Sequence, residues 1–154
     1  MSPSQPQNTD FFMAQPNDIV TARSFADLFA LIERSTLSVG GRGFIPERIL
    51  ILERLFCTDS PSQLDHVETS HFLPAQLYRL APEFCRSLAQ AEHETVLNAS
   101  VLWADSVAWQ GIDINPFDLA GFLISLQQLC QAAQRQNAVV YLLISDDGEW
   151  APSQ

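Results

Sequence analysis

The chain has 154 residues, of which 47% are hydrophobic, so a single domain can form a core without disulfides or a structural metal. All eight basic residues are arginine, and the absence of lysine excludes Schiff-base chemistry, a P-loop lysine and a lysine general base. The formal net charge of −10 argues against nucleic acid and anionic membranes as partners, because both would repel the chain.

The N-terminal segment, residues 1–17, is rich in Pro, Gln, Ser and Asn, which is typical of a flexible tail. It lacks the basic and apolar regions of a signal peptide, and no apolar run in the chain reaches the roughly 20 residues of a membrane span. We therefore expect a cytoplasmic protein. Phe11, Phe12 and Met13 interrupt the polar composition, and we expect them to pack back onto the domain rather than dock elsewhere.

The stretch that follows predicts a short strand and then a helix. Asp18–Ala22 is consistent with the strand. Ser24, followed three residues later by Asp27, resembles a capping box with Asp in place of the usual Glu. The apolar residues after this cap share one face over about ten residues, which indicates an amphipathic helix.

The segment Ser38–Phe44 is the only glycine-rich one in the chain. Backbone N–H groups of such a loop can hold a phosphate, and Arg42 would assist. The glycine spacing matches neither the dinucleotide fingerprint nor the Walker motif, so a plain connecting loop is the favoured interpretation. Pro46 then opens a helix that continues to Phe56.

A long polar connection, residues 57–72, carries a cluster of metal-like ligand types: His66, Glu68 and His71. Imidazole and carboxylate groups suit zinc. The two histidines are not four residues apart, as the metalloprotease helix requires, so a solvated loop is favoured over a metal site.

Two further segments have ambiguous periodicity. The apolar face of residues 75–91 keeps its phase across Pro82, which predicts one helix with a kink at the proline. Residues 97–109 alternate between apolar and small or polar side chains, which favours a strand. A helix that begins at Asn98 is the alternative, because Val101, Ala104 and Ala108 also align.

The best-defined stretch is residues 115–145, an amphipathic helix followed by an apolar strand. Asn115 is a natural N-cap, Pro116 suits the first helical position, and Asp118 lies near the positive end of the helix dipole. One apolar arc is predicted to face the core: Leu119, Phe122, Leu123, Leu126, Leu129, Cys130 and Ala133. The residues expected to point away from it are Gln127, Gln128, Gln131, Gln134 and Arg135.

The same helix carries a second, smaller apolar patch opposite the main arc, made of Phe117, Gly121 and Ile124. We expect another element of the domain to cover this patch, and a partner protein is the alternative. After the helix ends at Gln136 and Asn137, residues 138–145 predict a buried strand that needs neighbours for its backbone groups. Leu97–Trp103 and Asp18–Ala22 are the candidate neighbours.

The predicted fold class is α+β: a mostly helical single domain with a small sheet that includes the C-terminal strand at 138–145. We place a flexible tail at residues 1–17, one globular domain at 18–150 and a C-terminal tail at 151–154. Cys57, Cys85 and Cys130 are odd in number and widely spaced, which indicates reduced, buried thiols rather than disulfides or a zinc knuckle.

Two classes of function fit these features. The favoured one is a non-catalytic protein without cofactor or metal that acts through protein–protein interaction, as an adaptor, a regulator or an immunity or inhibitor-like factor. Residues 87–154 hold eight acidic residues and only Arg135 as a basic one, which suits a basic partner. The candidate partner-binding residues are Phe117, Ile124, Asp146, Asp147, Glu149 and Trp150.

Under this hypothesis the partner is a protein and neither nucleic acid nor membrane. The chain is also compatible with a homo-oligomer. The alternative is a small enzyme or metal-binding protein that uses Cys57, His66, Glu68 and His71. No sequence motif places these four groups in contact.

Overall fold

The computed structural model describes residues 8–35, 37–57, 65–67 and 76–145. Within these ranges it contains six α-helices, one short 3₁₀ helix and a five-stranded sheet in the order β2-β1-β5-β4-β3. All neighbouring strands are antiparallel. In chain order the elements are β1 (Asn8–Ala14), α1 (Pro16–Thr21), α2 (Phe25–Arg34), β2 (Ser38–Arg42), α3 (Pro46–Phe56), β3 (Asp65–Val67), β4 (Gln76–Arg79), α4 (Pro82–Gln90), α5 (His93–Ala104), η1 (Val107–Trp109), α6 (Pro116–Arg135) and β5 (Val139–Ser145).

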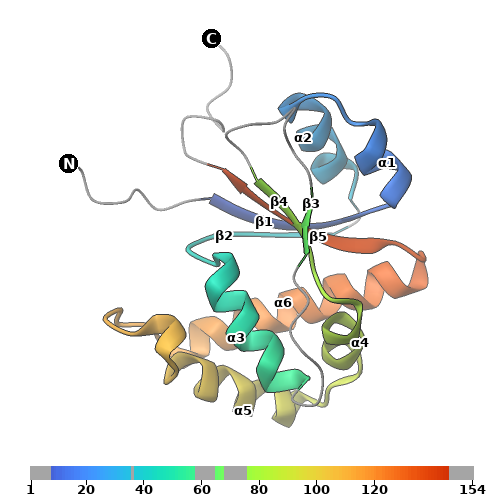
Figure 1. The fold of residues 1–154 in the computed structure, drawn as a ribbon. Helices are drawn as coiled ribbons and strands as arrows, with labels where there is room; N and C mark the ends of the chain where they lie inside the picture. Colours follow the sequence, from blue (N-terminus) through green and yellow to red (C-terminus); the bar gives the residue numbers. More distant parts are fainter. Residues whose placement is uncertain (1–7, 36, 58–64, 68–75, 146–154) are drawn as a thin grey trace, which may run out of the picture.

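The sheet is the middle of three layers (Figure 1): α1 and α2 cover one face, and α3 to α6 cover the other. Side chains alternate along β1, so Phe11 and Met13 belong to the larger core beneath α3 to α6, whereas Phe12 and Ala14 belong to the smaller core beneath α1 and α2. The predicted α+β class, with the C-terminal strand inside the sheet, is confirmed.

The predicted helix and strand at residues 115–145 are also confirmed. The Asn115 side chain accepts a hydrogen bond from the Phe117 backbone N–H at 2.8 Å and so caps the start of α6. At the other end Asn137 adopts a left-handed φ of 54°, and the Ala138 N–H donates to the Ala133 carbonyl at 2.8 Å. This Schellman-type ending turns the chain directly into β5.

The predicted apolar arc of α6 is buried throughout. Two of the glutamines expected to point away instead reach a neighbouring helix. Gln127 donates from Nε2 to the carbonyls of Leu88 and Ala91, both at 2.9 Å, and Gln131 donates to the Ala89 carbonyl at 3.0 Å. These amides donate to carbonyl groups in the last turn of α4 and at its C-cap, where the helix supplies few N–H partners; the Leu88 carbonyl also accepts from the Ala91 N–H at 3.2 Å.

The strand neighbours expected for β5 were wrong. The strand pairs with β1 and β4. Asn8–Ala14, placed by composition in a flexible tail, is therefore a central strand, and Phe11, Phe12 and Met13 pack into the domain as expected. Asp18–Ala22, expected as a strand, lies mainly in α1. Pro16 suits the first position of this helix, and Ile19 is its only buried residue.

The prediction of one kinked helix at residues 75–91 was also wrong. The segment divides into β4 and α4, and Pro82 is the first residue of α4, where its missing N–H costs nothing. Leu77 is buried in β4, and Leu80, Ala81 and Phe84 are buried in the larger core. The apolar pattern keeps its phase across Pro82 because β4 and α4 each bury one side, and not because they form one helix.

The strand favoured at residues 97–109 is replaced by the helical alternative. α5 starts earlier, at His93, and its buried residues Val96, Ala99, Ser100 and Trp103 follow helical spacing. The glycine-rich segment, interpreted as a loop, forms strand β2 opposite β1. Gly41 is needed there, because a Cβ atom at this position would lie 2.8 Å from the Phe44 ring.

Candidate functional site

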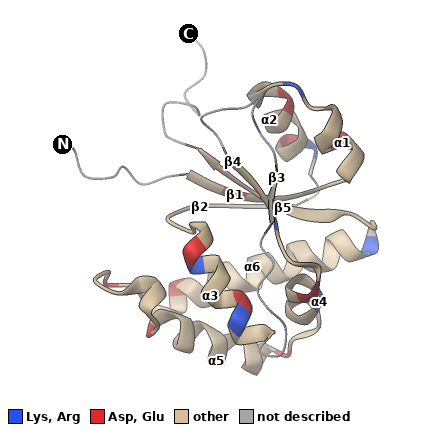
Figure 2. Ribbon diagram, viewed as in Figure 1, with Lys and Arg blue, Asp and Glu red and all other residues tan. Residues whose placement is uncertain are grey.

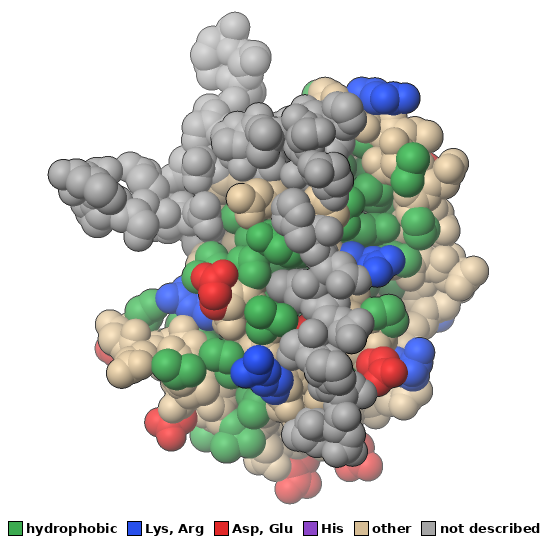
Figure 3. All heavy atoms as spheres, viewed as in Figure 1, with side chains coloured by type: hydrophobic (Ala, Val, Ile, Leu, Met, Phe, Trp, Pro, Cys, Tyr) green, Lys and Arg blue, Asp and Glu red, His purple; other side chains and the backbone are tan. Residues whose placement is uncertain are grey.

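Exposed apolar side chains concentrate where α5 passes through η1 into α6. We call this region the α5–α6 corner and define it by Val101, Leu102, Val107, Ile112 and Phe117, whose exposed fractions run from 45% to 82%. Among the described residues, only Val20 and Leu37 are other large exposed hydrophobic side chains. In the space-filling view (Figure 3) hydrophobic side chains are visible at the surface over this part of the molecule.

The corner rests on a cluster of buried or partly buried aromatic rings. Phe44 stacks on Phe122 with ring centroids 3.9 Å apart, and Trp103 and Trp109 meet edge to face at 5.4 Å. Trp103 and Trp109 are buried. The exposed residues of the corner are therefore the outer shell of a packed region, not side chains on a loose loop.

Arg48 of α3 ties η1 to this base. Its Nε donates to the Ala108 carbonyl at 2.8 Å, its Nη1 donates to the Gly43 carbonyl at 2.6 Å, and its guanidinium lies 4.4 Å from the centre of the Trp109 ring. The Trp103 Nε1 group donates to the Arg48 carbonyl at 3.0 Å. Burial lowers the pKa of the Arg48 guanidinium, the direction expected for a cation withdrawn from water. These contacts fix the backbone of the corner.

The exposed charged side chains that the chain from Val101 to the first turn of α6 contributes to the corner are all acidic, and the partly buried Arg48 of α3 is the cation beneath them. Asp105, Asp113 and Asp118 are exposed, and the sequence has no Arg or Lys between residues 87 and 134. In Figure 2, α5 and the first turns of α6 accordingly show acidic but no basic positions, whereas α3 carries both. Apolar side chains interleaved with carboxylates form an amphipathic surface with a negative potential.

Another element of the domain was expected to cover the second apolar patch of α6, but the described fold leaves Phe117 and Gly121 exposed. Phe117 is 82% exposed, and a Cβ atom built on Gly121 would have nothing within 4 Å. Ile124 is partly buried against the larger core. Asp146, Asp147, Glu149 and Trp150, the other proposed partner-binding residues, lie outside the residues that the structure describes.

The three cysteines, far apart in the sequence, gather around the end of α3, α4 and α6. The Cys85 thiol hydrogen-bonds with Cys130, and the Sγ of Cys57 lies 3.7 Å from the Oγ of Ser87. The hydrogen bond to Cys130 and burial raise the pKa of the Cys85 thiol well above its ordinary value. Because the reactive form is the thiolate, this environment suits packing better than nucleophilic attack. All three thiols are free.

Sequence separation hid this arrangement. No motif links Cys57, Cys85 and Cys130, and they come together because α3 and α6 both pack against α4. In the described ranges no group of three or more His, Cys, Asp or Glu residues is arranged to hold a metal ion. Glu68, His71 and the side chain of His66 fall outside those ranges, so the preference for a solvated loop over a metal site stays a prediction.

A buried carboxylate near the thiols has a structural partner. Glu53 of α3 is 1% exposed, and its Oε2 accepts a hydrogen bond from the Ala81 N–H at 3.2 Å. Ala81 is the N-cap of α4, where a negative charge is stabilised by the helix dipole. This hydrogen bond joins α3 to α4, which explains why a carboxylate is buried at this position.

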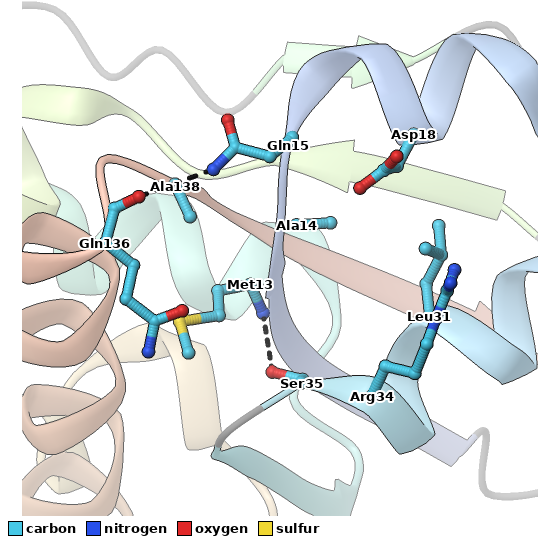
Figure 4. Close-up of a pocket in the computed structure, with 9 residues that line it drawn as sticks. All are labelled: Met13, Ala14, Gln15, Asp18, Leu31, Arg34, Ser35, Gln136 and Ala138. Atoms are coloured by element: carbon cyan, nitrogen blue, oxygen red, sulfur yellow. Dashed lines mark hydrogen bonds between the residues drawn. The ribbon is translucent and has the colours of Figure 1, made fainter.

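Two pockets in the described part of the chain offer room for a ligand. One, of about 460 Å³, lies beside Cys85 and Cys130, but its charged and amide side chains, among them Arg86 and Asn137, are all at exposed positions. The other, of about 240 Å³, is shown in Figure 4: Asp18 and Arg34 lie on its α1–α2 side, and Gln136 lies on its α6 side. There the Ser35 Oγ accepts from the Met13 N–H at 3.1 Å, and Gln15 reaches the Gln136 carbonyl at 3.4 Å.

Neither pocket combines a nucleophile, a base and an oriented third group, as a catalytic site requires. The smaller pocket falls below the usual 300–1,000 Å³ of small-molecule sites. Its polar groups join β1 to α2 and to the end of α6, which is a structural use. The α5–α6 corner is accordingly the stronger candidate.

Comparison with known proteins adds no assignment: no family model, curated protein or solved structure matches this chain. None of the described helices combines the length and the apolar composition required to cross a membrane.

Proposed function

We propose that the protein acts by binding a basic partner protein through the α5–α6 corner, as an adaptor, a regulator or an immunity or inhibitor-like factor, and that it does so in the cytoplasm without catalysis. The observation that carries this proposal is the coincidence of two features in one region. Five of the large exposed hydrophobic side chains lie there, and the exposed charged side chains between them, Asp105, Asp113 and Asp118, are acidic.

The apolar half of the surface supports binding affinity. A hydrophobic side chain contributes roughly 25 cal/mol for each Å² withdrawn from water. Phe117, at 82% exposed, is the side chain of the corner with the most to gain. Its backbone is fixed by the Asn115 cap, so little conformational freedom is lost when it is covered.

The acidic side chains of the surface support selection of a basic partner and fast association with it. Exposed carboxylates such as Asp105, Asp113 and Asp118 attract a basic partner over about a Debye length and raise the association rate. They also repel a second copy of the same surface. The proposal therefore favours a hetero-complex over a homo-oligomer formed through this corner.

The experiment that tests this function is co-purification with the full tagged chain from cells of its source, compared with the variants Phe117→Asp and Val20→Asp. Val20 is 75% exposed on α1, on the opposite side of the sheet, so the second variant adds the same charge at an equally exposed apolar site. We expect a basic protein to be retained by wild type and Val20→Asp and lost with Phe117→Asp.

Salt provides the second readout. Raising the ionic strength from about 0.05 M to about 0.5 M should weaken capture, because it screens the attraction between exposed charges. A captured protein that is acidic, that binds both variants equally, or that is indifferent to salt would contradict the proposal.

A further inference from the structure

The outer face of α6 suggests what part of a partner is bound, an inference that rests on the proposed function. Phe117 and Gly121 are one helical turn apart, so they lie on the same side of α6, and Ile124 follows one turn later. Phe117 and Gly121 are exposed and Ile124 is half-buried. This face is continuous in sequence with the α5–α6 corner.

The shape of this face is a projection followed by a depression. Phe117 stands out from the first turn of α6, and the absence of a side chain at Gly121 leaves the helix backbone accessible. Nothing in the described fold lies within 4 Å of the place where a Cβ atom would be. Internal packing therefore gives no reason for a glycine, which disfavours a helix relative to alanine.

The described elements that carry this face and the adjoining corner, α5, η1 and α6, are helical, so their own backbone offers no open strand edge. A partner segment that adds a strand has no template here, whereas a helix can place a side chain into the depression at Gly121 and cover Phe117. The exposed Asp118 beside this face, together with Asp105 and Asp113, would meet the flanks of such a helix.

We infer that the occupant is an amphipathic helix of a partner protein, with an apolar stripe that packs against Phe117 and over Gly121 and with Lys or Arg residues on its flanks. Charge complementarity selects this occupant. A second copy of this chain that docked through the same surface would bring its own carboxylates against Asp113 and Asp118, in a stretch that has no basic residue from 87 to 134 to pair with them.

The test is selection of phage-displayed random 20-residue peptides on the full-length protein, with counter-selection on Phe117→Asp. We expect the enriched peptides to have apolar residues at positions i, i+3, i+4 and i+7, to carry a net positive charge, and to lose at least about tenfold in affinity towards Phe117→Asp.

Gly121→Leu then tests the close approach to α6. This variant should bind the selected peptides at least about tenfold more weakly than wild type. Gln134→Leu is the matched control, because it adds the same side chain at an exposed position of α6 about 20 Å farther along the helix, and it should bind like wild type. Circular dichroism and thermal melting of each variant show that the fold is intact.

The outcomes separate this inference from the proposed function. If no enriched peptide depends on Phe117, both are wrong. If Phe117-dependent peptides are enriched but lack helical periodicity, or bind Gly121→Leu as tightly as wild type, the corner is a docking surface and the inferred helix is wrong.

Discussion

The guanidinium of Arg48 lies 4.4 Å from the centre of the Trp109 ring, and its Nε donates to the carbonyl of the residue before that tryptophan, Ala108. One side chain of α3 therefore holds both the ring and the backbone of η1. The candidate docking surface depends on this contact, because Val107 is exposed in the same short helix.

Arg48→Ala should lower the free energy of unfolding by about 2–3 kcal/mol, because it removes two hydrogen bonds to partly buried carbonyls and a cation–π contact. Urea denaturation measures this change. Arg54→Ala, at an exposed position of the same helix, serves as the control and should change stability by less than about 0.5 kcal/mol. Equal effects of the two substitutions would show that Arg48 does not anchor η1.

The turn between α6 and β5 makes a second prediction. Asn137 has a φ of 54°, a left-handed conformation that asparagine tolerates and alanine does not. Asn137→Ala should lower the free energy of unfolding by about 1 kcal/mol, whereas Asn137→Gly should leave it unchanged or raise it slightly. Thermal unfolding of the two variants side by side measures the difference, and a more stable alanine variant would contradict the assigned turn.

Asp10 of β1 makes stability depend on pH. Burial raises the pKa of its carboxyl group from 3.8 to about 6. The folded state therefore binds a proton more tightly than the unfolded state, so this group destabilises the fold progressively as pH rises from about 4 to about 6. Asp10→Asn should be more stable than wild type by about 1 kcal/mol at pH 7, because solvent still reaches part of the carboxylate.

The difference between wild type and Asp10→Asn, measured by urea denaturation at several pH values, isolates this group from the other carboxylates. It should be smallest near pH 4 and should grow to its full size by about pH 7. A difference that is constant with pH would show that the proton on Asp10 has no part in stability.

Gly121→Ala should stabilise the isolated protein by about 0.5–1 kcal/mol, because alanine is the better helix former and the structure leaves open space for its Cβ atom. Thermal melting measures this gain, with Ser125→Ala, one turn further along α6, as a comparison that should gain less. A loss of stability in Gly121→Ala would mean that a contact within this chain requires the glycine.

Local signals predicted the elements whose ends are marked by the sequence. Asn115 caps α6, Pro46 begins α3, and Ser24 accepts a hydrogen bond from the Asp27 N–H at 3.2 Å at the start of α2. These interactions join residues at most a few positions apart, so their pattern can be recognised without knowledge of the fold. The core-facing arc of α6 was predicted for the same reason.

Long-range pairing could not be predicted in this way. Residues 8–14 have the composition of a tail, yet they join the sheet because β5 lacks a partner on that side and Phe11 and Phe12 fill opposite faces of it. Burial on both faces removes the alternation that would mark a strand. Proline can end one element or begin another, and at Pro82 only the tertiary structure distinguishes the two.

The candidate site was predictable only in part. Phe117 and Ile124 were identified from helical periodicity. Val107 belongs to the segment 97–109, whose alternation favoured a strand, and Ile112 lies outside any periodic segment, so neither was identified as exposed. Their exposure follows from the packing of Trp103 and Trp109 inward, which only the structure shows. The gathering of the three thiols was likewise invisible, because it depends on the packing of α4 against α6.

The most direct test of the docking surface is site-specific photo-crosslinking in living cells, with a photoreactive phenylalanine analogue at Val107 or, as the control, at Val20. Both side chains are exposed, at 69% and 75%, and they lie on elements that cover opposite faces of the sheet. Binding through the α5–α6 corner predicts a covalent adduct with a basic protein from position 107 and none from position 20. No adduct from position 107, or the same adducts from both positions, would contradict it.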